Sequence, residues 1–261
     1  MSERPVGVFD SGLGGASVLR EALRLLPNEN YIYYGDSGNA PYGDKSDDDI
    51  TTLTMACIDK LMSMDVKAIL IACNTATAAS VSKVRQLMNQ YSMPIISIEP
   101  AIKPACEAGG NGKVLMLATA ATARLPRYRQ LLSRMVEPER VISVPCPGLV
   151  ERIEDGMLAV DGFDDILYKH LAFLEGETVD AIVMGCTHYV FIKDAFERYA
   201  AIHFNGRAKL FDGNEATVRQ LGRVLKENGI ENGSGSALID YRTSGDRLKL
   251  EPVFLSLINR L

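Results

Sequence analysis

The sequence predicts an α/β protein of two pseudo-symmetric, doubly wound domains, with the active site in the cleft between them. One observation is that short apolar runs alternate with segments of helical period along the 261 residues, which is typical of parallel sheets covered by helices. A second is that two runs, 66–73 and 179–186, begin with Val-Lys-Ala-Ile and Val-Asp-Ala-Ile and both end on a cysteine. A third is that another pair of strand ends, Asp10 and Thr119, repeats nearly the same offset.

The first strand and helix are predicted at 6–10 and 16–26, joined by a glycine-rich turn. Glycine lets backbone amides approach an anion at a helix N-terminus, so a phosphate loop is one interpretation. The turn lacks Gly-Lys-Ser/Thr and a full dinucleotide fingerprint, which argues against it. Asp10 is interpreted as a polar group aimed at a substrate, with N-capping of the next helix as its structural alternative.

The rest of the first domain follows the same alternation. A strand at 31–34 leads into a loop of turn-forming residues, 35–44, and Ser46 caps a helix at 47–64. The three aspartates 47–49 are interpreted as the acidic first turn of that helix and not as a metal site. The strand that ends at Cys73, a helix at 76–90 and a strand at 93–98 complete this part.

The second domain restarts the pattern after Glu99-Pro100. We expect a strand from 113 toward Thr119, a helix at 124–135, a strand at 140–144, helices at 149–155 and 163–175, and the strand that ends at Cys186. A strand at 208–211, a helix at 214–228, a Gly/Ser/Asn-rich link and a strand near 237–242 follow. The predicted division is 1–98 plus 208–261 for the first domain and 99–207 for the second.

Composition excludes several classes of function. A net charge of −5, a pI near 5.4 and the absence of a Lys/Arg-rich run argue against nucleic-acid binding. No apolar run approaches a membrane span, and the start of the chain runs into a strand without a signal-like segment, so we expect a cytoplasmic protein with no membrane partner. Five cysteines, an odd number in that setting, predict reduced thiols.

Cys73 and Cys186 are the candidate catalytic residues. Free cysteine is often buried as a small hydrophobe, so core packing is the simpler interpretation of either one alone. Two cysteines at matching ends of matching strands, each followed by Asn or Thr, favour a site. In open α/β sheets ligands bind beyond the carboxyl ends of the strands. The two thiols are therefore expected on opposite sides of the cleft.

Two opposed thiols fit acid/base chemistry better than their other uses. Metal binding is disfavoured because Cys186 and His188 are only two ligands and the chain has three histidines. A redox pair usually reads Cys-x-x-Cys, which is absent. A nucleophile with His188 as its base does not explain Cys73. If one thiol removes a proton from carbon and the other delivers a proton to the opposite face, both are used and a stereocentre is inverted.

Neighbouring polar residues have matching roles. Asp10 and His188 are suited to tune the thiols, and four further side chains are suited to hold carboxylates and an ammonium group: Ser11, Asn74, Thr75 and Thr187.

These motifs resemble the cofactor-independent glutamate racemase family. The resemblance rests on Asp10-Ser-Gly-Leu-Gly-Gly15, Pro41-Tyr-Gly43, Ala72-Cys-Asn-Thr-Ala-Thr77 and Gly185-Cys-Thr-His188, in that order. It implies interconversion of L- and D-glutamate to supply D-glutamate for peptidoglycan, without pyridoxal phosphate, metal or nucleotide. It also implies a homodimer.

The resemblance assigns roles to individual positions. Cys73 is implied to act on D-glutamate and Cys186 on L-glutamate, with Asp10 and His188 as their supporting acid/base residues. Substrate contacts are implied for Asp10, Ser11, Tyr42, Gly43, Asn74, Thr75, Thr119, Thr122, Thr187 and His188. A further catalytic glutamate, counted from Cys146-Pro147, falls at Glu154, with Glu151 as its competitor and a surface helix residue as the structural alternative.

Two segments depart from the family pattern. Residues 148–152 read Gly-Leu-Val-Glu-Arg where the family tends to be apolar with a second proline, which affects the assignment of Glu154. Residues 122–127 read Thr-Ala-Arg-Leu-Pro-Arg instead of Thr-Val-x-Ser, which suggests a change in how the domains meet.

Three alternatives remain. An aspartate racemase would differ in cleft size and in the contacts to the distal carboxylate. A thiol hydrolase or lyase would use one cysteine and tolerate loss of the other. A non-catalytic amino-acid-binding module would keep its function with both cysteines replaced by serine.

Overall fold

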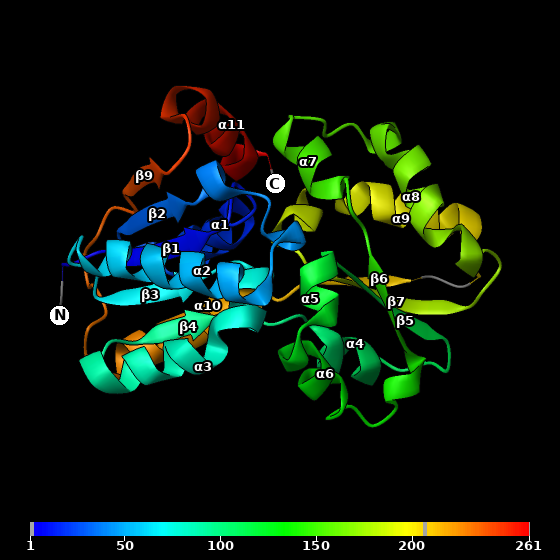
Figure 1. The fold of residues 1–261 in the computed structure, drawn as a ribbon, viewed down its shortest axis with the longest axis horizontal. Helices are drawn as coiled ribbons and strands as arrows, with labels where there is room; N and C mark the ends of the chain where they lie inside the picture. The colour runs from blue at the N-terminus through cyan, green and yellow to red at the C-terminus, as the bar shows by residue number, and fades with distance from the viewer. Residues whose placement is uncertain (1–2, 206–207, 261) are drawn as a thin grey trace.

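The computed structural model describes residues 3–205 and 208–260, and it shows two parallel sheets side by side (Figure 1). The first sheet has the order β4-β3-β1-β2-β9, and all four of its pairings are parallel. Its strands are β1 (Val6–Asp10), β2 (Tyr31–Gly35), β3 (Ala68–Ile71), β4 (Ile95–Ser97) and β9 (Ile239–Thr243).

The second sheet repeats the strand order of the first. Its order is β6-β5-β7-β8, again with parallel pairings only. If the strands of each sheet are numbered from its first strand in the chain, both sheets contain the order 2-1-3-4, which is that of flavodoxin-like folds. The strands are β5 (Lys113–Ala118), β6 (Val141–Pro145), β7 (Val179–Met184) and β8 (Lys209–Phe211).

Helices lie on both faces of each sheet, as expected for doubly wound domains (Figure 1). The first sheet packs with α1 (Ala16–Leu25), α2 (Asp47–Met62), α3 (Asn74–Tyr91), α10 (Asn214–Glu227) and α11 (Arg247–Asn259). The second domain carries α4 (Ile102–Glu107), α5 (Ala120–Arg124), α6 (Pro126–Leu132), α7 (Leu149–Glu154), α8 (Asp164–Leu171) and α9 (Lys193–His203). Short 3-10 helices are η1 (Ser37–Asn39), η2 (Tyr42–Asp44), η3 (Pro138–Arg140), η4 (Val160–Phe163), η5 (Ala172–Leu174) and η6 (Thr187–Ile192).

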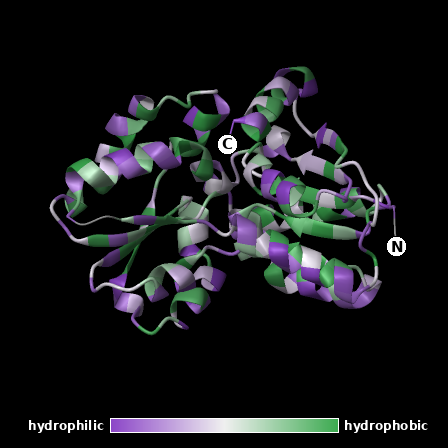
Figure 2. Cartoon of the chain, turned by 180° about the vertical axis from the view of Figure 1, so that it is seen from behind, coloured by the Kyte–Doolittle hydropathy of each residue, from purple (hydrophilic) through white to green (hydrophobic). Residues whose placement is uncertain are grey.

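The core follows from strands that are apolar along their whole length. All residues of β1 and β3 are buried, as are nearly all of β5 and β7, because helices cover both sheet faces. Figure 2 shows the hydrophobic colour concentrated on the strands, while the outer helices alternate between hydrophobic and hydrophilic colours. The ring of Phe254 lies 4.4 Å from the rings of both Tyr33 and Tyr241, which fixes α11 on the first sheet.

The structure corrects three expectations. The strand expected at 208–211 forms, but β8 pairs with β7, so it lies in the second sheet and not in the first domain as predicted. The helix expected at 124–135 is confined to α6 (Pro126–Leu132), because Leu125 is extended in front of Pro126, and α5 (Ala120–Arg124) is a separate helix before it. Helices α4, α9 and α11 were not predicted.

The chain crosses between the sheets twice, after β4 and after β8, and the two crossings touch. A Cβ atom at Gly213 would collide with the carbonyl oxygen of Glu99, so glycine is required there by close approach. Both connections therefore run together on one side of the cleft. Within residues 3–205 and 208–260, no helix is both long and apolar enough to cross a membrane.

Candidate active site

A cavity between the two sheets gathers most of the predicted residues. Strand order explains this, because it reverses between β1 and β3 in one sheet and between β5 and β7 in the other, and open sheets bind ligands at such points. The cavity is lined by Ser11, Ala40, Pro41, Tyr42, Gly43, Asp44, Cys73, Asn74, Thr75, Thr119, Ala120, Cys146, Pro147, Val150, Glu151, Glu154, Cys186, Thr187 and His188.

Two predicted residues lie behind the cavity wall. Asp10 is fully buried and Thr122 is 1% exposed, and neither lines the cavity. Both reach it through hydrogen bonds to residues that do. Cys146 is a wall residue that the sequence analysis used only for counting. Its position at the carboxyl end of β6 was the available signal.

Cys73 stands between β3 and α3 and is 5% exposed. Its Sγ lies 3.3 Å from Ser11 Oγ and accepts a hydrogen bond from the N–H of Ala76 at 3.4 Å, in the first turn of α3. Burial raises the pKa of Cys73 to about 12, with the charge of Asp10 acting in the same direction and the Ser11 and Ala76 contacts opposing. In this closed arrangement Cys73 is a protonated thiol.

Cys186 faces the cavity from the other sheet, just before η6, and is 8% exposed. Its Sγ lies 3.7 Å from Nδ1 of His188, and Nε2 of His188 lies 2.8 Å from Oε1 of Glu154. Burial alone acts to lower the pKa of His188, but its hydrogen bonds to Cys186 and Glu154 raise it well above 6.5. His188 is therefore an imidazolium that donates to a sulfur on one side and a carboxylate on the other.

Glu154, at the end of α7, joins the two domains. Its Oε1 also accepts a hydrogen bond of 3.0 Å from the N–H of Leu13 in the glycine-rich turn. Burial acts to raise the pKa of Glu154, but the hydrogen bond and charge of His188 outweigh it, and the pKa is lowered. The structure pairs this glutamate with His188, while Glu151 lies exposed at the cavity.

Asp10 ends β1 and contacts both domains. Its Oδ1 accepts from the N–H of Gly12 at 2.9 Å, and its Oδ2 accepts from the hydroxyl of Thr187 at 3.2 Å. Burial is the main cause of a raised pKa at Asp10, with the charge of His188 opposing it. The carboxyl group thus lies between the two thiol sites and holds a proton more readily than an exposed aspartate.

Three threonine hydroxyls meet across the cleft. Thr75 Oγ1 lies 2.9 Å from Thr119 Oγ1 and 3.0 Å from Thr122 Oγ1, and the last two are 3.0 Å apart. Thr75 comes from the start of α3, while Thr119 caps α5 and accepts from the N–H of Thr122. The carboxamide oxygen of Asn74 is buried and has no hydrogen-bond partner among the described residues.

The loop with Tyr42 and Gly43 closes one end of the cavity. The Tyr42 hydroxyl donates to Oδ2 of Asp36 at 2.7 Å, so it points into the first domain and is already used there. Gly43 approaches the second domain so closely that a Cβ atom would lie 3.1 Å from Cβ of Thr119. Gly43 has no side chain, so at this position the loop offers its backbone to a ligand.

The wall carries neither Lys nor Arg among the described residues. An anionic ligand would meet hydroxyls, a carboxamide and the N–H groups at the start of the 18-residue helix α3. No group of three or more His, Cys, Asp or Glu residues in the described part of the chain is placed to hold a metal ion.

Fold and site together define a two-domain α/β enzyme with one thiol on each wall of its cleft. A family model described as Asp/Glu/Hydantoin racemase matches residues 7–221. A glutamate racemase of Clostridium perfringens is 44% identical over 234 residues, covering 90% of this chain and 88% of the relative. One of Clostridium botulinum is 40% identical over 250 residues, covering 95% and 94%. The chain belongs to the Asp/Glu/hydantoin racemase family and is an amino-acid racemase.

Solved structures agree with this membership. The glutamate racemase of Francisella tularensis in complex with D-glutamate matches with a TM-score of 0.84 and 28% identity, covering 99% of this chain and 94% of that one. The Escherichia coli glutamate racemase, solved with L-glutamate and the activator UDP-MurNAc-Ala, matches with a TM-score of 0.80 and 27% identity, covering 97% and 95%.

Proposed function

We propose that this protein interconverts L- and D-glutamate without a cofactor, using Cys73 and Cys186 as a two-base pair. The observation that carries the proposal is the placement of one buried thiol on each wall of a single cavity, at equivalent strand ends of two matching sheets. The glutamate racemases that cover most of the chain at about 40% identity support glutamate as the substrate.

The proposed reaction transfers two protons in sequence. With L-glutamate, the thiolate of Cys186 takes the α-proton, so that a C–H bond breaks and an S–H bond forms. The electron pair moves into the α-carboxylate as an enediolate. Cys73 then gives its proton to the opposite face, and its S–H bond breaks as the new C–H bond forms. With D-glutamate the two thiols exchange roles, so no electrons are gained or lost overall.

The protonation of the site supports this assignment. Burial holds Cys73 as a thiol, the form that donates a proton. The imidazolium of His188 lies 3.7 Å from the sulfur of Cys186, so a positive charge stands beside the second thiol group. Glu154 keeps His188 charged, and Asp10 supplies a proton-holding carboxyl near Cys73.

Substrate binding is assigned to neutral donors. The two carboxylates of glutamate would be met by Ser11, Asn74, Thr75, Thr119 and Thr187, with the backbone at Gly43 and the start of α3. Neutral donors stabilise the extra charge of an enediolate without the strong ground-state binding that a buried arginine would give.

The cellular role is part of the proposal. D-Glutamate made here would supply peptidoglycan synthesis in the cytoplasm, and the protein would act as a homodimer. These points rest on the family resemblance and the sequence. Analytical ultracentrifugation of the purified protein tests the dimer, and rescue of a D-glutamate-requiring bacterial strain tests the role.

Proton NMR in D2O tests the chemistry directly. Wild type, Cys73→Ala and Cys186→Ala are incubated separately with each enantiomer and no added cofactor, and Cys106→Ala, which removes a thiol outside the cavity, is the matched control. We expect wild type and the control to exchange the α-proton and invert both enantiomers, and neither cavity variant to racemise. If glutamate keeps its α-proton, the proposal fails, and the same test with aspartate examines the sister activity.

A further inference from the structure

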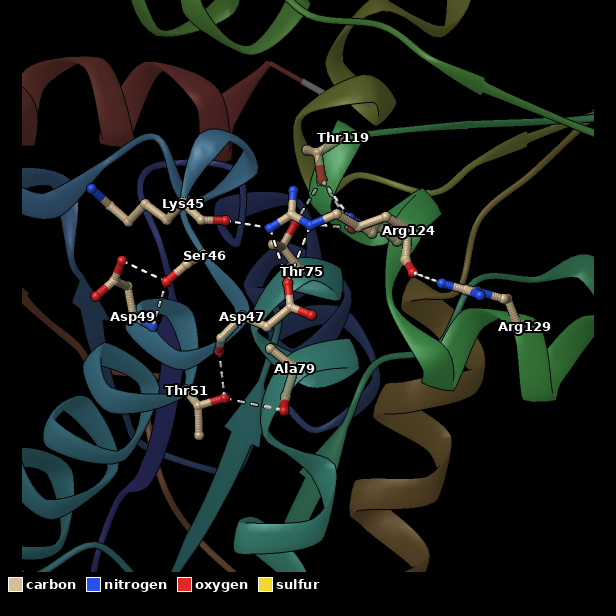
Figure 3. Close-up of polar contacts among 11 residues, drawn as sticks. Lys45, Ser46, Asp47, Asp49, Thr51, Thr75, Ala79, Thr119, Arg124 and Arg129 are labelled. Atoms are coloured by element: carbon tan, nitrogen blue, oxygen red, sulfur yellow. Dashed lines mark hydrogen bonds and ion pairs between the residues drawn. The ribbon is translucent and has the colours of Figure 1, made fainter.

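An arginine of the second domain grips the first domain beside the cavity. The guanidinium of Arg124, the last residue of α5, contacts Oδ1 of Asp47 through Nε at 3.2 Å and through Nη2 at 3.0 Å. Its Nη2 also donates to the carbonyl oxygen of Lys45. Figure 3 shows the side chain reaching from α5 toward both partners, with Thr75 and Thr119 close by.

The partners of Arg124 belong to the loop that covers one end of the cavity. Ala40, Pro41, Tyr42, Gly43 and Asp44 all line it, and Lys45 follows directly. We call residues 40–45 the mouth loop. Its η2 turn packs on α5, and Gly43 is in close contact with Thr119. Arg124 therefore fastens the mouth loop to the opposite domain at a point just outside the cavity, which it does not itself line.

Asp47 and Arg124 both lie in segments that are held by hydrogen bonds of their own. The Ser46 hydroxyl accepts from the N–H of Asp49 and caps α2, so Asp47 is fixed in the first turn. On the other side, Arg129 donates to the carbonyl oxygen of Arg124 at 2.8 Å. A fork-shaped guanidinium between two fixed acceptors loses less side-chain entropy on binding than a freely moving pair.

The two thiols are largely shielded from solvent while the walls meet. Cys73 and Cys186 are less than one-tenth exposed. The hydroxyl of Thr75 is hydrogen-bonded to the opposite domain, so a group predicted to hold substrate is occupied while the walls meet. Both crossings of the chain lie together at Glu99 and Gly213. They can therefore act as a hinge about which the two walls move apart.

We propose that Arg124 is a positioning residue that latches the mouth loop to the second domain and so favours the closed, substrate-holding form of the site. The effect of the latch on catalysis rests on the proposed racemase function. The contact between Arg124 and Asp47 does not depend on that function.

The expected effect is modest, because the pair is partly in water. The side chains of Arg124 and Asp47 are 42% and 49% exposed. Pairs of this exposure usually change an equilibrium by about 1.5- to 5-fold. We therefore expect loss of the latch to raise the open population about two- to fivefold, with the backbone contact to Lys45 adding to the ion pair.

Thiol labelling measures the open population without any catalysis. Iodoacetamide modification of each cysteine is followed by mass spectrometry in wild type, Arg124→Ala, Asp47→Asn and the double variant. Labelling of Cys73 and Cys186 should rise about two- to fivefold in each single variant. In the double variant the labelling rate should rise by less than the product of the increases in the two single variants, because both substitutions remove the same contact. About 1 M salt should bring wild type toward Arg124→Ala, because the contact is partly exposed.

Two controls make the result specific. Asp48→Asn removes the same charge from the same turn of α2 as Asp47→Asn, without touching Arg124, and should leave labelling unchanged. Cys106, outside the cavity and only partly buried, is an internal reference whose rate should stay constant. Three results would each overturn the latch. They are an equal rise in cavity-thiol labelling in Asp48→Asn, a parallel rise in the labelling rate of Cys106, and unchanged labelling in Arg124→Ala.

Steady-state kinetics separates this proposal from the function itself. With glutamate as substrate, Arg124→Ala should raise KM about two- to fivefold and leave kcat equal or higher, because the chemistry of the thiols is untouched. A large loss of kcat with KM unchanged would overturn the positioning role. If wild type does not racemise glutamate while the labelling pattern holds, the proposed function fails and the latch stands.

Discussion

Glu154→Gln is the sharpest test of the site's electrostatics. Glutamine has nearly the same shape and keeps an acceptor oxygen for the N–H of Leu13 and for His188, but it removes the negative charge. Because that charge helps to raise the pKa of His188, the variant should lower this pKa. Neutral His188 would no longer place a positive charge beside the sulfur of Cys186.

The size of the effect follows from the 2.8 Å contact between Nε2 of His188 and Oε1 of Glu154. Hydrogen bonds to charged groups contribute about 1.5–3 kcal/mol and neutral ones about 0.5–1.5 kcal/mol. The loss is then about 1.4 kcal/mol, a tenfold change in the proton affinity of the imidazole. We expect the alkaline limb of kcat/KM to move to lower pH by about one pH unit.

The assay is the initial rate of racemisation, followed by circular dichroism from about pH 5 to about pH 10, where kcat/KM reports groups of the free enzyme. Glu151→Gln is the matched control. Glu151 is exposed and lies one turn before Glu154, so this variant removes the same charge from a nearby position. An alkaline limb that stays in place in Glu154→Gln, or that moves equally in Glu151→Gln, would refute the reasoning.

The same pair sets a pH window of stability. The raised pKa of His188 makes its contribution complete below pH 6.5 and lost as pH rises through the folded-state pKa. The lowered pKa of Glu154 makes its contribution complete above pH 4.5 and lost as pH falls through the folded-state pKa. The Tm difference between wild type and Glu154→Gln should therefore be largest between pH 4.5 and 6.5.

Three further predictions test the packing of the fold. Gly14→Ala would push a methyl group into the imidazole of His188, and we expect kcat to fall about 100-fold, so full activity would contradict this packing. Lys67→Met breaks the buried 2.6 Å pair with Glu29 at the amino ends of the strands, which should lower the free energy of unfolding in urea by about 3–5 kcal/mol with the active-site chemistry intact. Tyr42→Phe removes a hydrogen bond to a buried aspartate, and it should cost about 1–3 kcal/mol of stability without changing KM, whereas a large rise in KM would show that the hydroxyl reaches substrate.

The sequence carried enough information for the two sheets and for the thiols. Strands such as β3 and β7 are apolar throughout, and both lead directly to a cysteine, so their ends could be located from the pattern alone. The division of the chain into two domains was harder to predict from the sequence. Strand β8 has three residues, Lys209–Phe211, and nothing in so short a run says which sheet it joins.

Side-chain direction was the other gap. Asp10 and Thr122 both stand near predicted strand ends, yet both lie behind the wall, because the pattern does not say where a side chain points. Arg124 and Asp47 are 77 residues apart and both exposed, so no local signal connects them. Glu154 could be placed only by its distance from Cys146 in the family pattern.

The interrupted course of the first sheet has a consequence for biosynthesis. All four strands of the second sheet have been translated once the ribosome passes Phe211, whereas the first sheet still lacks β9, with α10 and α11 to cover it. Because domains generally fold as units, the lobe that begins the chain is the last to be completed. A nascent chain stalled after Phe211 would carry both cysteines while its first lobe lacked an edge strand and two covering helices, so the active cleft would form only near the end of translation.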